Sequence, residues 1–159
     1  MLLFTWMFLV TPIQIEQIYD VYLAAFTPQN RFKDHELEDY FAEKVMPRLK
    51  KPLLLAVAID QNRIIAYAIF EKFAMNYYLA EMAVQPEYQG KGIGKKLVFS
   101  ILEKDPAAKK IVLLTEIENR WSRPFYEKIG FKPSTFYLPD YSPEIFTAYE
   151  FSIYPSLRK

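Results

Sequence analysis

Three of the four glycines in this chain fall within six residues, Gln89-Gly90-Lys91-Gly92-Ile93-Gly94. The preceding residues 77–84 are mostly aromatic and aliphatic, which predicts a largely buried strand. From Ile93 onward the apolar side chains recur at helical spacing. These are Ile93, Leu97, Val98, Ile101 and Leu102. The predicted order is therefore strand, glycine-rich turn and helix.

The start of a helix after such a turn is suited to binding an anion. The first N–H groups of a helix have no partners within it, and the helix dipole places partial positive charge at the same end. Glycine lets the backbone approach a bulky anion closely, while Lys91, Lys95 and Lys96 add positive charge nearby. The stretch therefore predicts a pyrophosphate site.

Two common phosphate-binding motifs do not fit the spacing. The Rossmann fingerprint would need a third glycine where the chain has Lys95 or Leu97. A P-loop ending on Gly94 and Lys95 would need glycine in place of Gln89, and serine or threonine in place of Lys96. Both motifs are excluded, and the glycine turn must belong to another class of site.

The remaining pattern resembles the acetyl-CoA-binding motif of the GNAT superfamily of N-acetyltransferases. That motif has glutamine or arginine, then a glycine, then glycine or alanine, matched here by Gln89, Gly92 and Gly94. A second stretch, from Asn119 to Phe131, resembles the family pattern that ends in Tyr-Glu-Lys-x-Gly-Phe and places a tyrosine at Tyr126. The two motifs occur in the family's order, with a predicted strand between them.

The residues before the glycine turn predict a strand, two helices and a hairpin. Thr11, Pro12 and Gln14 form the pattern of a helix start with a capping box. Asp34 can begin a second helix, which Pro47 is expected to interrupt. The strands are expected at residues 1–10, 53–59 and 64–70.

After the glycine-turn helix, residues 110–116 predict a strand parallel to 77–84, because a strand–helix–strand crossover joins them. Ser122 is expected to cap a helix at 122–129, which Gly130 closes. Two closing strands are expected at 131–138 and 146–154. This order matches the GNAT superfamily, which implies an α+β fold: a mixed α/β sheet of about seven strands with four helices, whose two parallel strands splay apart.

The composition fits one GNAT domain covering residues 1–159. The chain is 52% hydrophobic and 25% charged, which is enough to build a substantial core. A formal net charge of +1 gives no general attraction to nucleic acid or to an acidic membrane. With no cysteine and one histidine, no metal is expected. The first ten residues lack the features of a signal peptide and are too short to span a bilayer, so we predict a cytoplasmic protein.

The resemblance implies transfer of an acetyl group from acetyl-CoA to a primary amine by direct attack in a ternary complex (EC 2.3.1.-). In the family, the strand end pairs with the pantetheine arm, a backbone N–H near Val84 polarises the thioester carbonyl, and the turn holds the pyrophosphate. The implied acetyl-CoA-binding residues are Met82, Ala83, Val84, Gln89, Gly90, Lys91, Gly92, Ile93, Gly94, Lys95, Asn119 and Tyr126.

Tyr126 and Glu81 are the implied catalytic residues. A tyrosine at the motif position of Tyr126 would protonate the departing CoA thiolate. An alkyl amine is almost fully protonated at neutral pH, so a base must remove its proton. Glu81 is the nearest candidate in the sequence, with Glu116 or a water relay as alternatives. Taken alone, Glu81 also fits an ordinary strand carboxylate and Tyr126 an ordinary core residue.

The acceptor amine stays open at this point. The resemblance places the acceptor cleft between residues 27–33 and 139–144. Asp140 and Glu144 suit a cationic acceptor but also fit ordinary surface charge, and the candidate pocket walls are Phe32, Tyr137 and Tyr141. A small-molecule amine and a protein N-terminus or lysine both fit, and the acyl-chain preference and a homodimer are open as well. The motifs also fit a second class of function, a regulatory module that binds CoA without turnover.

Overall fold

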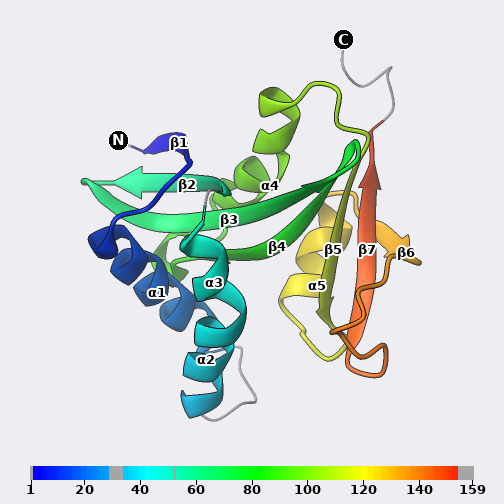
Figure 1. Ribbon diagram of the computed structural model, residues 1–159, viewed down its shortest axis with the longest axis horizontal. Coiled ribbons are helices and arrows are strands. Elements are labelled where there is room, and N and C mark those ends of the chain that lie inside the picture. Colours follow the sequence, from blue (N-terminus) through cyan, green and yellow to red (C-terminus); the bar gives the residue numbers. More distant parts are fainter. Residues whose placement is uncertain (1, 29–33, 52, 154–159) are drawn as a thin grey trace. The chain divides into compact units, whose positions relative to one another are not determined.

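The computed structural model describes residues 2–28, 34–51 and 53–153 (Figure 1). They form two compact units. The first unit contains the chain up to Phe70 together with Glu81–Ser100, and the second contains Glu71–Ala80 and the chain from Ile101 onward. The acceptor-loop residues 29–33, the first residue of the strand expected at 1–10 and the last residue of the strand expected at 146–154 lie outside the described residues.

The strands of the described residues form one mixed sheet in the order β1-β2-β3-β4-β5-β7-β6, which confirms the predicted fold class. Strand β1 (Leu3–Met7) pairs antiparallel with β2 (Leu54–Asp60), and β2 pairs antiparallel with β3 (Arg63–Phe73). Gln61 and Asn62 join β2 to β3 with positive φ values of 50° and 62°, as a tight hairpin turn of this hand requires.

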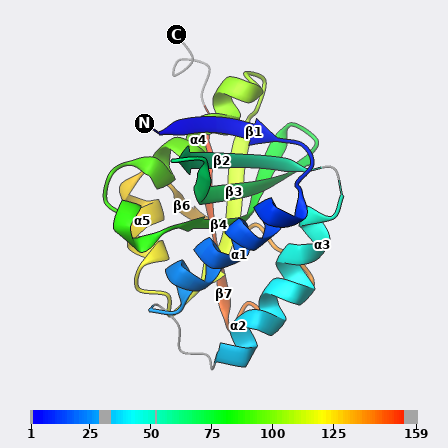
Figure 2. The same cartoon turned by 90° about the vertical axis from the view of Figure 1, so that its left-hand side faces the viewer.

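The first helix, α1 (Pro12–Phe26), begins as the sequence predicts. Thr11 Oγ1 accepts from the backbone N–H of Gln14, and the Gln14 side chain accepts from the backbone N–H of Thr11, so the capping box is confirmed. The helix packs on the next helical segment through Tyr22, whose ring lies 5.1 Å from that of Phe41. Figure 2 shows α1 running across β1–β3 beside that segment.

The prediction that Pro47 interrupts the second helix was wrong. Helix α2 (Asp34–Tyr40) continues through a π-helical turn, Phe41–Val45, into α3 (Met46–Leu49). Pro47 is the second residue of α3. The wider π turn before it changes the hydrogen-bond pattern of the helix, so the chain remains helical past the proline.

The central order of strand, turn and helix is confirmed. Strand β4 (Asn76–Val84) ends before a short 3₁₀ turn (Pro86–Tyr88), and α4 (Ile93–Lys104) follows the glycines. Strand β5 (Lys110–Glu116) is parallel to β4, as expected, and their register pairs Asn76–Tyr78 with Lys110–Val112.

In the second unit, α5 (Ser122–Lys128) leads to β6 (Lys132–Ser134) and β7 (Phe146–Ser152). Strand β6 is much shorter than the predicted 131–138. The Ser134 hydroxyl donates to Glu150 Oε1 at 2.7 Å and accepts from the backbone N–H of Phe136 at 3.1 Å. This local turn ends the pairing with β7 because the side chain now satisfies the backbone.

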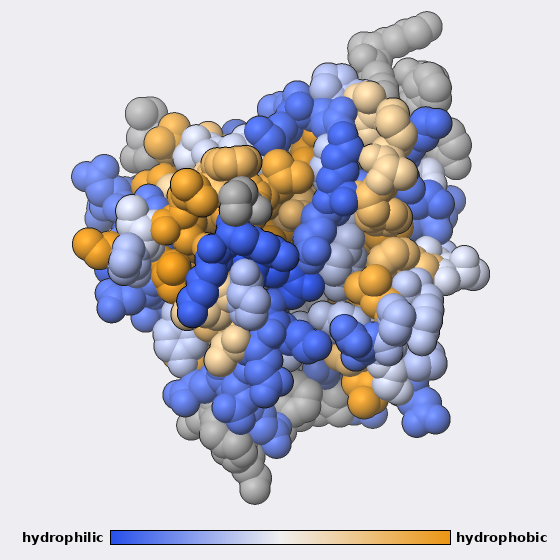
Figure 3. Space-filling view, viewed as in Figure 1, coloured by the Kyte–Doolittle hydropathy of each residue, from blue (hydrophilic) through white to orange (hydrophobic). Residues whose placement is uncertain are grey.

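The core of the first unit centres on β3, where every residue from Ile64 to Phe70 is buried. Apolar surface is visible over the β1 side of this unit in Figure 3. The exposed apolar side chains near β1 include Leu3, Phe8, Leu9 and Ile13. Within the described ranges, no helix is long and apolar enough to cross a membrane.

Candidate active site

The glycine turn in the first unit leaves its backbone open. Gly90 and Gly92 have positive φ values of 78° and 82°, a region that side chains with a Cβ rarely adopt. A Cβ added at either position would meet no other atom within 4 Å. Because α4 begins at Ile93, this open backbone lies directly before the partial positive charge of a helix start.

Two contacts hold the turn in place. The Gln89 side chain donates to the Val84 carbonyl at 2.8 Å and so ties the turn to the end of β4. The Val84 carbonyl is therefore engaged within the protein. The Tyr88 hydroxyl donates to Asp60 Oδ2 at 2.5 Å, which connects the 3₁₀ turn to the end of β2. This second contact joins residues far apart in the sequence, and sequence reasoning missed it.

The lysines of the turn have different neighbours. The Lys91 ammonium lies 5.4 Å from the centre of the Tyr88 ring, and the Lys96 ammonium lies 4.0 Å from the centre of the Phe4 ring on β1. Both distances are in the range of a cation–π contact. Lys96 is therefore directed at β1, and Lys91 stays beside the turn.

Glu81 lies on β4 in the same unit as the glycine turn. Burial raises its pKa to about 8, although the positive charge of Arg48 and a hydrogen bond with the Met82 backbone act in the opposite direction. The side chain keeps some surface open to solvent but is otherwise surrounded by protein. A carboxyl group with this pKa is present in both its ionised and its protonated form near neutral pH, and such a group suits the role of a general base.

Asn119 belongs to the second unit and holds the turn that leads into α5. Its Oδ1 accepts from the backbone N–H groups of Trp121 and Ser122, at 3.0 and 2.9 Å. The prediction that Ser122 is the N-cap was wrong, because Ser122 is the first helical residue and its hydroxyl lies 2.6 Å from that of Thr115. The Ser122 hydroxyl thus bonds to the nearby strand, and the Asn119 side chain bonds to the backbone N–H of Ser122.

Tyr126 is buried in the second unit. Its ring makes edge contacts with Phe125 and Phe131, with centroid distances of 5.1 and 5.5 Å. Its carbonyl accepts from the backbone N–H of Phe131 at 2.9 Å, just after Gly130 with its positive φ of 107°. The ring therefore has a packing role, and the catalytic role of its hydroxyl stays a prediction. Glu116, the alternative base, lies at the end of β5 opposite Phe146 of β7.

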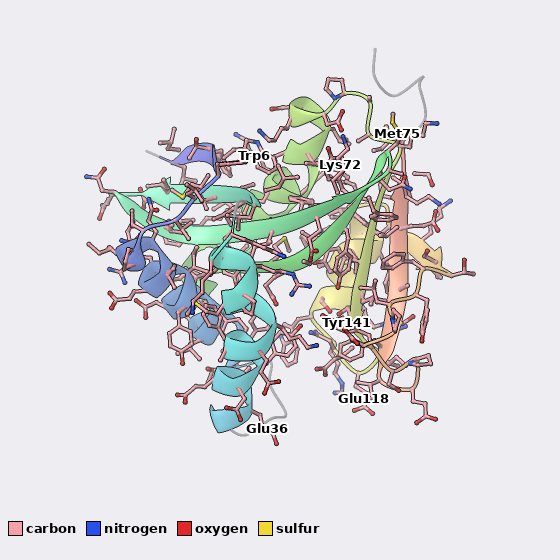
Figure 4. The ribbon with its side chains drawn as sticks, in the orientation of Figure 1. Trp6, Glu36, Lys72, Met75, Glu118 and Tyr141 are labelled. Atoms are coloured by element: carbon pink, nitrogen blue, oxygen red, sulfur yellow. The ribbon has the colours of Figure 1, made fainter. Side chains whose placement is uncertain are left out.

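The predicted acceptor-loop residues differ in exposure. Asp140 and Glu144 are exposed, whereas Tyr141 is buried and its ring packs edge-on against Phe146 at 4.9 Å. Figure 4 shows Tyr141 at the same end of the second unit as Glu118, which follows β5. Among the described side chains, no group of three or more His, Cys, Asp or Glu residues could hold a metal ion.

Sequence reasoning missed the surroundings of Glu81. The positive charge of Arg48 on α3 lowers the pKa of this carboxyl group. The negative charge of Glu81 in turn raises the pKa of Tyr67 on β3 and of Tyr22 on α1. One signal was available, since Tyr67 is the one residue with a polar side-chain group within the run 64–70. Nothing in the sequence pattern connects the other two residues to β4.

The family and the curated proteins that this chain matches are acetyltransferases. The model of the acetyltransferase (GNAT) family matches residues 15–131. N-alpha-acetyltransferase 30 of Schizosaccharomyces pombe is 37% identical over 82 residues, covering 47% of this chain and 55% of that protein. The ribosomal protein bS18-alanine N-acetyltransferase of Haemophilus influenzae is 38% identical over 77 residues, covering 46% and 51%. The chain thus spans about half the length of the curated relatives it matches.

Among solved structures, the PaiA N-acetyltransferase of Thermoplasma acidophilum, crystallised with coenzyme A, superimposes with a TM-score of 0.78. It is 18% identical, and the match covers 96% of this chain and 99% of that one. A putative streptothricin acetyltransferase of Bacillus anthracis in complex with acetyl-CoA has a TM-score of 0.57 at 24% identity, covering 68% of each chain. At these identities the similarity shows the fold.

The pKa of Glu81 makes stability depend on pH. Between its ordinary value of 4.5 and about 8, the folded state holds a proton that the unfolded state has lost. The free energy of unfolding should therefore fall by a few kcal/mol as pH rises through this window, and level off above it. We expect Glu81→Gln to remove this fall. Urea denaturation of both proteins across the window checks the prediction, and parallel pH curves would contradict it.

Proposed function

Because this chain belongs to the acetyltransferase (GNAT) family, we propose that it transfers the acetyl group of acetyl-CoA to the α-amine of a protein N-terminus. Of the two curated relatives, one is an N-alpha-acetyltransferase and the other acetylates an alanine nitrogen of ribosomal protein bS18. Both activities favour a protein α-amine over a small-molecule amine or a lysine side chain.

The open, left-handed backbone at Gly90 and Gly92 is the observation that carries the proposal. The N–H groups of a glycine turn before a helix suit a pyrophosphate, and the empty space beside both glycines lets it approach. Residues 90–94 would hold this group, with Lys91 and Lys95 supplying positive charge. When bound, acetyl-CoA supplies an activated acetyl thioester.

The pKa of Glu81 supports an α-amine as the acceptor. An α-amino group has a pKa of about 7.7–8.0 and a lysine about 10.4. Proton transfer from an α-ammonium group to a carboxylate whose pKa is about 8 is nearly balanced. Transfer from a lysine ammonium would be uphill by roughly 3 kcal/mol. We assign Glu81 the task of taking the acceptor's proton, which frees the nitrogen lone pair for attack.

Two further roles are part of the proposal. Tyr126 would donate its hydroxyl proton to the departing thiolate, since a phenol is protonated at neutral pH. The two compact units would act as one acetyltransferase domain over residues 1–159, because β3, β4 and α4 each run from one unit into the other.

An acceptor panel tests the proposed function. Release of free CoA thiol from acetyl-CoA should be fastest with peptides that have a free N-terminus. Matched peptides with a blocked N-terminus and a free lysine, and a polyamine, serve as controls. Faster turnover with either control would overturn the choice of acceptor. Binding of CoA with no turnover of any amine would instead favour the regulatory module.

Replacing Gly92 tests the pyrophosphate site. Gly92→Asp and Gly92→Asn share the backbone strain of a side chain at positive φ, but only the aspartate adds negative charge beside the anion. We expect Gly92→Asp to lower CoA affinity at least about tenfold, and well below that of Gly92→Asn. Calorimetry on the folded variants measures both. If both variants bound CoA with wild-type affinity, the pyrophosphate would not lie at this turn.

Removing one hydroxyl tests the role of Tyr126. If that hydroxyl protonates the thiolate, Tyr126→Phe should lower kcat/KM by on the order of 100-fold, with little change in acetyl-CoA affinity. If the ring only packs against Phe125 and Phe131, phenylalanine keeps those contacts and the rate stays near that of the wild type. Steady-state rates with the best acceptor of the panel separate the two cases.

A further inference from the structure

One tyrosine hydroxyl in the first unit is buried without a partner. Tyr67 lies in the middle of β3 and has a relative exposure of 0%. Within the described part of the chain, its hydroxyl oxygen makes no hydrogen bond. Buried hydroxyls nearly always have a hydrogen-bond partner, because a hydroxyl group that loses its bonds to water on folding and gains none in return destabilises the folded state. Phenylalanine would fill the same space without this cost, so the hydroxyl itself requires an explanation.

The groups that act on Tyr67 come from the elements packed around it. Burial, and after it the negative charge of Glu81 on β4, raises the pKa of Tyr67 well above its ordinary value. Tyr22 on α1 and Tyr40 on α2 act in the same direction. Arg48 on α3 acts on Glu81. The Tyr67 hydroxyl therefore keeps its proton at all relevant pH values and can only serve as a neutral hydrogen-bonding group.

Glu81 is the neighbour with acceptor capacity to spare. The Tyr22 hydroxyl donates to the Leu37 carbonyl at 2.9 Å, and the Arg48 guanidinium donates to the carbonyl of Lys44. Glu81 is bonded to the backbone of Met82, which uses one of the roughly four lone-pair sites of a carboxylate. A donor on β3, the strand next to β4 in the sheet, can therefore still be accepted.

We propose that Tyr67 is a positioning residue for Glu81: its hydroxyl donates a hydrogen bond, through one bridging water, to the ionised Glu81 carboxylate. The inference rests on the proposed function, in which the acceptor's ammonium proton moves to a Glu81 oxygen and leaves the nitrogen lone pair free. Tyr67 keeps its own proton throughout. Its contribution is to fix the direction of the carboxylate and to favour the ionised form that can act as a base.

This role has a measurable consequence for Glu81. A hydrogen bond to the ionised form of an acid lowers its pKa. Loss of the Tyr67 hydroxyl should therefore raise the pKa of Glu81 and reduce the ionised fraction near neutral pH. The fall in rate should appear in kcat, whereas the affinity for acetyl-CoA should not change, because the glycine turn is untouched.

Tyr67→Phe is the decisive variant. We expect the titration midpoint of the Glu81 carboxyl group, followed by carbon-13 NMR without any acetyl-CoA or acceptor, to rise by about 0.5–1 on the pH scale. Turnover at pH 7 should fall roughly three- to tenfold, as the smaller ionised fraction requires. The melting temperature should stay close to that of the wild type, because phenylalanine fills the same buried space.

Tyr77→Phe is the matched control. It deletes the same group from the next strand, where the hydroxyl donates to Asp105 Oδ2 at 2.5 Å in the second unit, and it should leave the Glu81 titration unmoved. An unchanged Glu81 titration in Tyr67→Phe would overturn the inference, whatever happens to the rate. If the titration shifts as expected but no acceptor is turned over by the wild type, the positioning role stands and the proposed function fails.

Discussion

Burial of the Glu81 carboxyl group is the constraint to which much of the first unit responds. A charged carboxylate is costly away from water, so the group keeps its proton to a higher pH than usual. The positive charge of Arg48 offsets only part of this effect. Strand β4 carries the group, and α3 supplies the positive charge of Arg48; the Glu81 charge in turn raises the pKa values of Tyr67 on β3 and Tyr22 on α1. The fold therefore makes the Glu81 carboxylate a stronger base than an ordinary glutamate, which is fully ionised at neutral pH.

The same strand leads into the glycine turn. The backbone of β4 ends at Val84, and the Gln89 side chain reaches back to its carbonyl, so the turn cannot drift away from the strand that carries Glu81. The bond between Tyr88 and Asp60 adds an anchor to β2. The proposed base and the proposed pyrophosphate-binding backbone are thus held on one continuous piece of chain. Their mutual placement requires no long loop, which limits the conformational freedom lost on binding.

The sequence was sufficient for the features that depend on local chemistry. The capping box of Thr11 and Gln14, the order of strand, turn and helix around Gly92, and the parallel pairing of β4 with β5 all follow from residue type and spacing. The features that the sequence did not predict depend on tertiary contacts. Ser122 was predicted to cap α5, but the Thr115 hydroxyl on the adjacent strand competes for it. The neighbours of Glu81 come from elements distant in the sequence, and no local pattern connects them.

The π-helical turn at Phe41–Val45 has a consequence for the helical period. Apolar residues four apart drift by about 40° per step around a regular α-helix, or about 120° over three steps. Yet Leu37, Phe41, Val45 and Leu49 are all buried, because the wider turn takes back part of that rotation. The extra width thus keeps this side of α3 facing inward. Deleting one residue there would convert the wider turn into a regular α-helical turn and leave the same side of α3 facing inward.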